Sequence, residues 1–288
     1  MARAHHHLTS VVPSGPRWPE GREEAGNPQE EQQTSGYKDN PERGLSFGSV
    51  AEDYDRYRPW PPRAAMEWIL PHRVAVALDL GAGTGALSRR LLARADEVVA
   101  VEPDERMRAV LARSLPRVHV QAGRAESLPL PDASVDAVLV SSAWHWLDPA
   151  SAVPEIARVL RRGGIFGILW TGLDWQAAFG SVVGQALRDT DAGAAADRRS
   201  HEPEDVRLPP GAPFGRPETI RLPFHWQVSP ERLIGLLGPY SSIFTLPQRQ
   251  RTRVLDQARA FLSTDPRFAG QRRLDVAMSC RCWKAVRL

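Results

Sequence analysis

The stretch LDLGAGTG at residues 78–85 decides the fold of this 288-residue chain. An apolar run at 74–78 leads into it, and a helical pattern of apolar residues follows at 86–95. A second apolar run then ends in Glu102, seventeen residues after Gly85. A strand, a glycine-rich turn, a helix and a second strand that ends in a carboxylate form the arrangement with which a doubly wound sheet holds the adenosine of a nucleotide-like cofactor.

The acids beside this turn separate two classes of cofactor. Gly81, Gly83 and Ala86 satisfy the dinucleotide fingerprint, and the Glu102 carboxylate can accept hydrogen bonds from the free ribose hydroxyls of either NAD or S-adenosylmethionine (SAM). Asp79 is more discriminating, because it ends the first strand beside the place where a pyrophosphate would lie. A negative charge there repels an anion and attracts the ammonium and sulfonium groups of SAM. The pattern therefore favours SAM.

Further motifs resemble known proteins in the same order along the chain. Together with the glycine-rich stretch, VEPDERM at 101–107, AESLPLPDASVDAV at 125–138 and ARVLRRGG at 157–164 resemble class I SAM-dependent methyltransferases. Two more stretches, SFGSVAEDYDRYRPWP at 46–61 and AWHWLD at 143–148, resemble the type 11 small-molecule branch, which includes trans-aconitate methyltransferase-like proteins. The resemblance is strong from about residue 46 to 171 and weak beyond.

The pattern and the resemblance together imply a set of cofactor-binding residues. We expect Asp79 to fix the methionyl end of SAM, directly or through water, although an acid at a strand end could instead cap the next helix. We expect Glu102 to bind the ribose hydroxyls, and the alternative is a solvated charge at a helix start. The full set is Asp79, Gly81, Ala82, Gly83, Gly85, Glu102, Pro103, Met107, Ala125, Tyr54 and Ser141.

The segment that holds Tyr54 and Arg58 follows a helical pattern. The resemblance places this helix over the cofactor, where a tyrosine can meet the methionyl carboxylate. Arg58 could do the same, could bind an acidic substrate through a bidentate pair, or could be a surface residue of a packing helix.

Arg124 departs from the family pattern, which often has a short polar or acidic residue here to meet the adenine amino group. Arginine has only donors and cannot accept from that group. We therefore expect the backbone around Ala125 to bind the ring edge, while Arg124 either stacks over adenine or points away.

His145 is the candidate catalytic residue. It follows the fourth expected strand on the side where the methyl acceptor should lie, and its neutral imidazole could accept a proton from an attacking group. A histidine packed between Trp144 and Trp146 is an equally good interpretation. Methyl transfer depends mainly on in-line positioning of a nucleophile, so a base is not required.

Alternating strand and helix patterns predict an α/β fold: a Rossmann-like, doubly wound, mostly parallel seven-stranded sheet with a C-terminal antiparallel hairpin. The hairpin is what the resemblance implies. Strands are expected near 75–80, 97–101, 117–121, 135–141, 164–170, 219–227 and 273–286, and helices near 63–70, 85–95, 104–114, 150–161, 175–189, 230–238 and 247–263.

The domain organisation follows from composition. Residues 1–43 are polar and rich in Pro, Gly, Glu and Gln, which predicts a disordered tail. Residues 44–288 are expected to form one methyltransferase domain, with a cofactor-binding core at 44–171 and a substrate or lid segment with the C-terminal strands at 172–288. Within the latter, 190–216 is expected to be a long irregular insertion or lid.

Composition also argues against several classes of protein. The chain lacks an apolar stretch long enough to span a membrane and an apolar signal core, so we expect a cytoplasmic location and no membrane partner. The net charge is +3, and nearly all of the positive charge is arginine. No basic run is interleaved with aromatic residues, so no nucleic-acid partner is expected. Cys280 and Cys282 should share one face of a strand and pack there, because no further C-x-x-C pair suggests zinc.

We therefore expect a SAM-dependent methyltransferase that transfers a methyl group to a small-molecule acceptor and releases S-adenosylhomocysteine. One alternative is a catalytically inactive SAM-binding relative with a regulatory role. The other is an NAD-dependent oxidoreductase, which Asp79 opposes. The acceptor and the oligomeric state are left open by the sequence.

Overall fold

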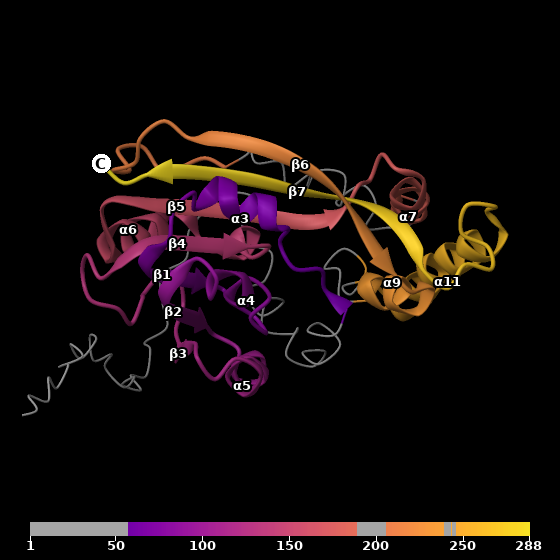
Figure 1. The fold of residues 1–288 in the computed structure, drawn as a ribbon, viewed down its shortest axis with the longest axis horizontal. Coiled ribbons are helices and arrows are strands. Elements are labelled where there is room, and N and C mark those ends of the chain that lie inside the picture. The colour runs from indigo at the N-terminus through magenta and orange to yellow at the C-terminus, as the bar shows by residue number, and fades with distance from the viewer. Residues whose placement is uncertain (1–56, 189–205, 239–242, 244–245) are drawn as a thin grey trace, which may run out of the picture.

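A computed structural model describes residues 57–188, 206–238, 243 and 246–288. Over these residues the core is a seven-stranded sheet with the order β3-β2-β1-β4-β5-β7-β6 (Figure 1). All pairs from β3 to β5 are parallel, and β7 runs antiparallel to both of its neighbours. The expected α/β class, the doubly wound sheet and the C-terminal antiparallel hairpin are confirmed. Residues 1–56, including the expected tail and Tyr54, lie outside the described residues.

The strands lie close to their expected positions. Their bounds are β1 Val74–Leu80, β2 Ala95–Glu102, β3 His119–Ala122, β4 Val135–Ser141, β5 Leu160–Leu173, β6 Glu218–Val228 and β7 Leu274–Val286. Since the order of strands reverses between β1 and β4, the loops that follow these two strands meet at the switch point, where doubly wound sheets bind ligands.

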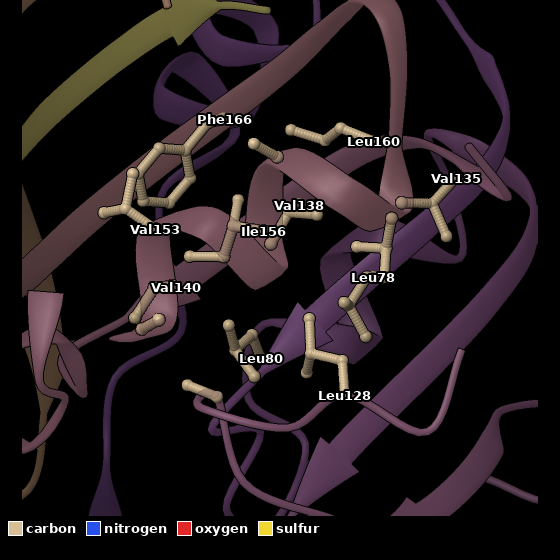
Figure 2. Close-up of a cluster of buried hydrophobic side chains, with 14 of the residues drawn as sticks. Leu78, Leu80, Leu128, Val135, Val138, Val140, Val153, Ile156, Leu160 and Phe166 are labelled. Carbon is tan, nitrogen blue, oxygen red and sulfur yellow. The ribbon is translucent and has the colours of Figure 1, made fainter. Parts of the chain in front are cut away.

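Helices cover both faces of the sheet, and their bounds are α3 Arg63–Ile69, α4 Ser88–Leu91, α5 Glu105–Ser114, α6 Pro149–Val159, α7 Ala178–Arg188, α9 Pro230–Leu237 and α11 Gln248–Thr264. Side chains of α3, α4 and α5 share one buried apolar cluster with one face of the sheet. On the other face, α6 packs Val153 and Ile156 onto Val138, Val140 and Phe166 (Figure 2).

The local sequence explains where these helices begin. Asp104 precedes α5 and accepts hydrogen bonds from the backbone N–H groups of Arg106 and Met107. Asp148 caps α6 in the same way at Ala150. Such caps satisfy donors that the first turn of a helix leaves without partners.

The expected helix at 85–95 is wrong in length. Only residues Ser88–Leu91 are regular helix, and hydrogen-bonded turns flank them. The reason is Gly85, whose φ of 92° is far from the helical value, so the helix cannot begin there. Strand β2 in turn begins at Ala95, which removes the expected C-terminal end of the helix.

The C-terminal hairpin extends past the end of β5 toward three helices, as Figure 1 shows. There β5 pairs with β7 only as far as Met278, while β6 pairs with it down to Leu274. A separate buried apolar cluster joins this end of the hairpin to α7, α9 and α11. We call these three helices and the hairpin end the helical cap. The described part of the expected insertion, 206–216, contains no regular helix or strand.

Strand β6 forms one edge of the sheet. Pro223 lies in the middle of it, opposite Ser279 of β7. Its neighbours Arg221 and His225 are exposed, which is typical of an edge strand.

Candidate cofactor site

The glycine turn, residues 81–85, follows β1 at the switch point. Gly81, Gly83 and Gly85 have φ values of 67°, 56° and 92°, in the left-handed region that favours glycine. A methyl group at Gly81 would also lie 2.8 Å from the Cβ of Ala143 in the loop after β4. The turn is therefore a surface of bare backbone, which lets a ligand approach closely.

Glu102 closes this turn from the neighbouring strand. It is only 8% exposed, and its carboxylate accepts hydrogen bonds from the backbone N–H of Gly83 at 2.8 Å and of Asp104 at 3.0 Å. Burial raises the pKa of this carboxyl, and the two N–H groups oppose the shift. Each carboxylate oxygen has a second lone pair, so Glu102 can still accept from the hydroxyls of a ribose.

Asp79 lies fully buried beneath the turn. Its Oδ2 accepts a hydrogen bond from the Ser88 hydroxyl at 2.6 Å, whereas its Oδ1 has no hydrogen-bond partner among the described residues. Burial raises the pKa of this carboxyl to about 7, against the hydrogen bonds from Ser88, and the nearby Glu102 carboxylate adds to the rise. One oxygen thus contacts the start of α4 through Ser88, and the other is buried without a hydrogen-bond partner among the described residues. An unsatisfied buried carboxylate oxygen is costly, and a cationic ligand group would satisfy it.

A cavity adjoins the turn. Its walls come from the glycine turn and the two residues before α4, from the ends of β4 and β5, and from the segment that precedes α3: Arg58, Pro59, Gly81, Ala82, Gly83, Ala86, Leu87, Ser141, Ser142 and Thr171. Arg58 brings a cation to this wall, while Asp79 lies two residues before Gly81. A bare-backbone cradle with an acid and a base beside it fits a ligand that carries both an ammonium and a carboxylate, as the methionyl group of SAM does.

The other expected cofactor residues among the described residues do not line this cavity. Gly85 faces α5, where an added methyl group would lie 2.9 Å from the Leu115 side chain, so its lack of a side chain allows close packing of the turn. Met107 in α5 and Ala125 in the loop after β3 are both buried. Pro103 lies on the loop between β2 and α5, next to Glu102.

Arg124 points toward Glu126, with 3.5 Å between Nε and Oε2, and about half of its side chain is exposed. Residues 124 and 127 also form an isolated bridge that tightens this loop. Ala125 between them is buried in the apolar cluster on the α6 face. The Arg124 side chain is therefore held by its own loop.

His145 lies in a short 3-10 turn, Trp144–Trp146, directly after β4. The side chain is half-buried and its ring lies 4.6 Å from that of Trp146, with a tilt of 46°. Trp144 is buried and packs 5.6 Å from Phe166. The loop is thus anchored by Trp144, and His145, whose two ring nitrogens are buried, does not line the cavity.

Sequence reasoning missed several residues of the cavity wall. Ser142 has a φ of 55°, which is rare outside glycine and is typical of functional sites. Thr171 is buried and donates a hydrogen bond from its hydroxyl to the Cys280 sulfur at 3.3 Å. The Ser-Ser pair at a strand end was a visible signal for Ser142, whereas Thr171 carries none, because only strand pairing brings it to the cavity.

Other sequence expectations concern metals and membranes. Cys280 and Cys282 are buried free thiols on one face of β7, with sulfurs 3.7 Å apart, as the alternation of a strand predicts. Within the described ranges, no group of three or more His, Cys, Asp or Glu side chains could hold a metal ion. No helix in the same ranges is long and apolar enough to cross a membrane.

Comparison with known proteins identifies the family. A sequence profile described as "Methyltransferase domain" matches residues 78–168. An uncharacterised methyltransferase of Mycobacterium tuberculosis is 40% identical over 246 residues, which cover 84% of this chain and 96% of that protein. An uncharacterised methyltransferase-like protein of Schizosaccharomyces pombe is 30% identical over 231 residues, 77% of this chain and 88% of that protein.

The fold agrees with this relationship. A solved structure from Anaeromyxobacter dehalogenans, provisionally assigned as a type II methyltransferase, matches with a TM-score of 0.62 and 28% identity, covering 80% of this chain and 98% of its own. The chain therefore belongs to the methyltransferase family and is a class I SAM-dependent methyltransferase.

Proposed function

We propose that this enzyme transfers the methyl group of SAM to a small-molecule acceptor and releases S-adenosylhomocysteine. The observation that carries the proposal is the pairing of charges at the glycine turn. The unpartnered Oδ1 of Asp79 lies buried beneath the turn, and Arg58 lines the cavity beside it. These groups suit the ammonium and the carboxylate of the methionyl end.

The remaining cofactor residues would then contact the ribose and the adenine of SAM. Glu102, already ordered by Gly83 and Asp104, would accept from the ribose hydroxyls. Backbone groups at Ala125 would meet the adenine edge, and Pro103 and Met107 would flank the ring. Ser141 belongs to the cavity wall, and Tyr54 would join from the segment before Arg58.

The chemistry is a single displacement. The bound cofactor supplies a methyl group already activated by a positive sulfur. The acceptor's nucleophilic atom forms a bond to the methyl carbon while the carbon–sulfur bond breaks, and the electron pair of that bond stays on sulfur. An acceptor proton, where there is one, passes to His145 or to water. The protein's main contribution is to hold the two reactants in line.

We infer that residues 44–288 act as one domain in this reaction, with 44–171 binding the cofactor and 172–288 shaping the acceptor side. The helical cap supports this division, because its helices pack on the projecting end of the C-terminal hairpin, beyond the end of β5. An acceptor that enters past His145 would then lie between the cap and the cofactor core.

Calorimetric titration with SAM, S-adenosylhomocysteine and NADH tests the cofactor assignment, with an Asp79→Ala variant beside the wild type. We expect micromolar binding of both adenosyl compounds, lost in the variant, and no binding of NADH. Binding of NADH alone would overturn the proposal. A screen of small acids, amines and phenols with methyl-labelled SAM then tests turnover, and cofactor binding without turnover on any acceptor would favour the inactive regulatory relative.

A further inference from the structure

Residues 57–62 cross from the helical cap to α4, and we call this segment the strap. One end is fixed to α4. The Arg90 Nε donates a hydrogen bond to the Pro61 carbonyl at 2.8 Å. The guanidinium groups of Arg89 and Arg90 lie 5.4 Å and 5.3 Å from the ring centre of Trp60, within the range of cation–π attraction. This end of the strap is therefore held independently of the cap.

The other end of the strap is fixed to the cap. The Tyr57 side chain packs against the apolar cluster of the cap, and its ring lies on Gly235 of α9. A methyl group built on Gly235 would come within 2.6 Å of the ring carbons Cδ1 and Cε1 of Tyr57, which is closer than real contacts allow. Gly235 is in the middle of a helix, where glycine is disfavoured relative to alanine. The notch it creates is filled by the Tyr57 ring.

The cofactor cavity lies between these two anchors. Arg58, the residue after Tyr57, and Pro59 both line it. The lining residues include none from α7, α9 or α11, and the strap is one segment that joins the cap to the cavity wall. Arg58 is adjacent to Tyr57 in the chain. The packing of the Tyr57 ring against Gly235 therefore fixes the position of the Arg58 backbone.

We propose that Tyr57 is a positioning residue for the cofactor: by seating on Gly235 of the cap, it holds Arg58 in the cavity against the methionyl carboxylate. The inference rests on the proposed function for its ligand. It extends that function by making cofactor affinity depend on a cap residue that does not line the cavity. It also explains why α9 contains a glycine at position 235, where the Tyr57 ring leaves no space for a side chain.

The experiment compares Gly235→Ala with Gly238→Ala, a matched change at the end of the same helix. Among the described residues, a methyl group at Gly238 would meet only the Gly235 carbonyl, at an ordinary 3.5 Å, and Gly238 has a helical φ of −55°. Binding of S-adenosylhomocysteine is measured by calorimetry on the full chain. We expect Gly235→Ala to weaken it about tenfold and Gly238→Ala to leave it unchanged.

A second ligand separates a positioning role from a general loss of structure. Methylthioadenosine lacks the amino-acid end, so its affinity should be the same in Gly235→Ala and in the wild type. Equal weakening of both ligands would show a damaged site and would overturn the proposal. Failure of the wild type to bind S-adenosylhomocysteine would instead overturn the proposed function.

Variants of the strap test the same positioning role if Gly235→Ala does not fold. Tyr57→Ala removes the ring without a clash and should weaken S-adenosylhomocysteine as Gly235→Ala does, whereas Tyr57→Phe keeps the ring and should restore binding. In an Arg58→Ala background, Tyr57→Ala should add no further loss, because both act through one guanidinium. Additive losses would show that Tyr57 does not act through Arg58, and the proposal would fail.

Discussion

The glycine turn and the helical cap are held together by different kinds of interaction. In the turn, three residues need positive φ, and two buried carboxylates contact particular backbone and hydroxyl groups. In the cap, helices pack through leucine, valine and phenylalanine side chains in an ordinary apolar cluster. Many apolar sequences could fill such a cluster, whereas few could build the turn.

This difference explains why the motifs that carry the resemblance to methyltransferases gather around the turn, within residues 46–164, and not in the cap. The constraint in the first region comes from a ligand, and in the second from packing, which tolerates substitution. Gly235 is the exception, since it is a cap residue whose identity is fixed by a contact with the strap. The comparison predicts that cap substitutions lower stability, while substitutions at the turn lower cofactor affinity.

The largest expected effect is on stability. Leu262→Ala in α11 removes a buried side chain of the cap cluster and should lower the free energy of unfolding by about 2–5 kcal/mol. The affinity for S-adenosylhomocysteine should stay unchanged at temperatures where the variant is folded. Chemical denaturation measures the first and calorimetry the second, with the exposed Arg253→Ala as control. A loss of affinity comparable to that of a turn variant would break the comparison.

Asp79→Asn should show the opposite behaviour. It keeps an oxygen for the Ser88 hydroxyl but removes the charge that a cationic cofactor group would meet, a change of about 1.5–3 kcal/mol, or roughly ten- to hundredfold in the Kd for SAM. Thermal stability without cofactor should not fall, because a buried charge is removed. A variant that binds SAM as tightly as the wild type would exclude Asp79 from the cofactor site.

Glu102→Gln should have a smaller effect on affinity, about tenfold or less. The amide retains one acceptor but turns an NH2 group toward a backbone donor, at either Gly83 or Asp104. The ribose hydroxyls also lose a charged acceptor. Titration with S-adenosylhomocysteine measures the loss, and the exposed Glu105→Gln in the adjacent helix is the control. Loss of affinity in the control alone would contradict the assignment.

A pH dependence of the stability of the cofactor-free protein is also expected. The pKa of Asp79 rises from 3.8 to about 7 on folding, because the carboxyl is buried. Between these values the folded protein binds more protons than the unfolded chain, so the contribution of Asp79 to stability falls as the pH rises from 3.8 to about 7. Above that pH the unfavourable contribution is complete and constant.

The difference in Tm between wild type and Asp79→Asn across this pH range isolates the contribution of one carboxyl from that of all others. We expect the Tm of the wild type to fall relative to that of the variant as the pH rises. A difference that does not change with pH would show that Asp79 ionises normally in the folded protein.

Local patterns in the sequence predicted most of the fold and part of the site. Strand and helix periods, with the glycine turn between them, were enough to place β1, β2 and the edge of the sheet where Glu102 lies. The error in the helix at 85–95 arose because the left-handed φ of Gly85 is a backbone property that a helical pattern does not reveal. Thr171 and the contact between Tyr57 and Gly235 could not be predicted, since each depends on residues brought together only by the complete fold.

Pro223 in β6 has a consequence for how this enzyme behaves in concentrated solution. An edge strand of eleven residues presents backbone donors and acceptors that another chain could extend into a continuous sheet, which is a common route to aggregation. The proline removes a donor from the middle of that edge, and exposed Arg221 and His225 add charge or polarity beside it. The row of backbone hydrogen-bonding groups is therefore interrupted in the middle of the edge strand. This interruption protects the folded enzyme from edge-to-edge association.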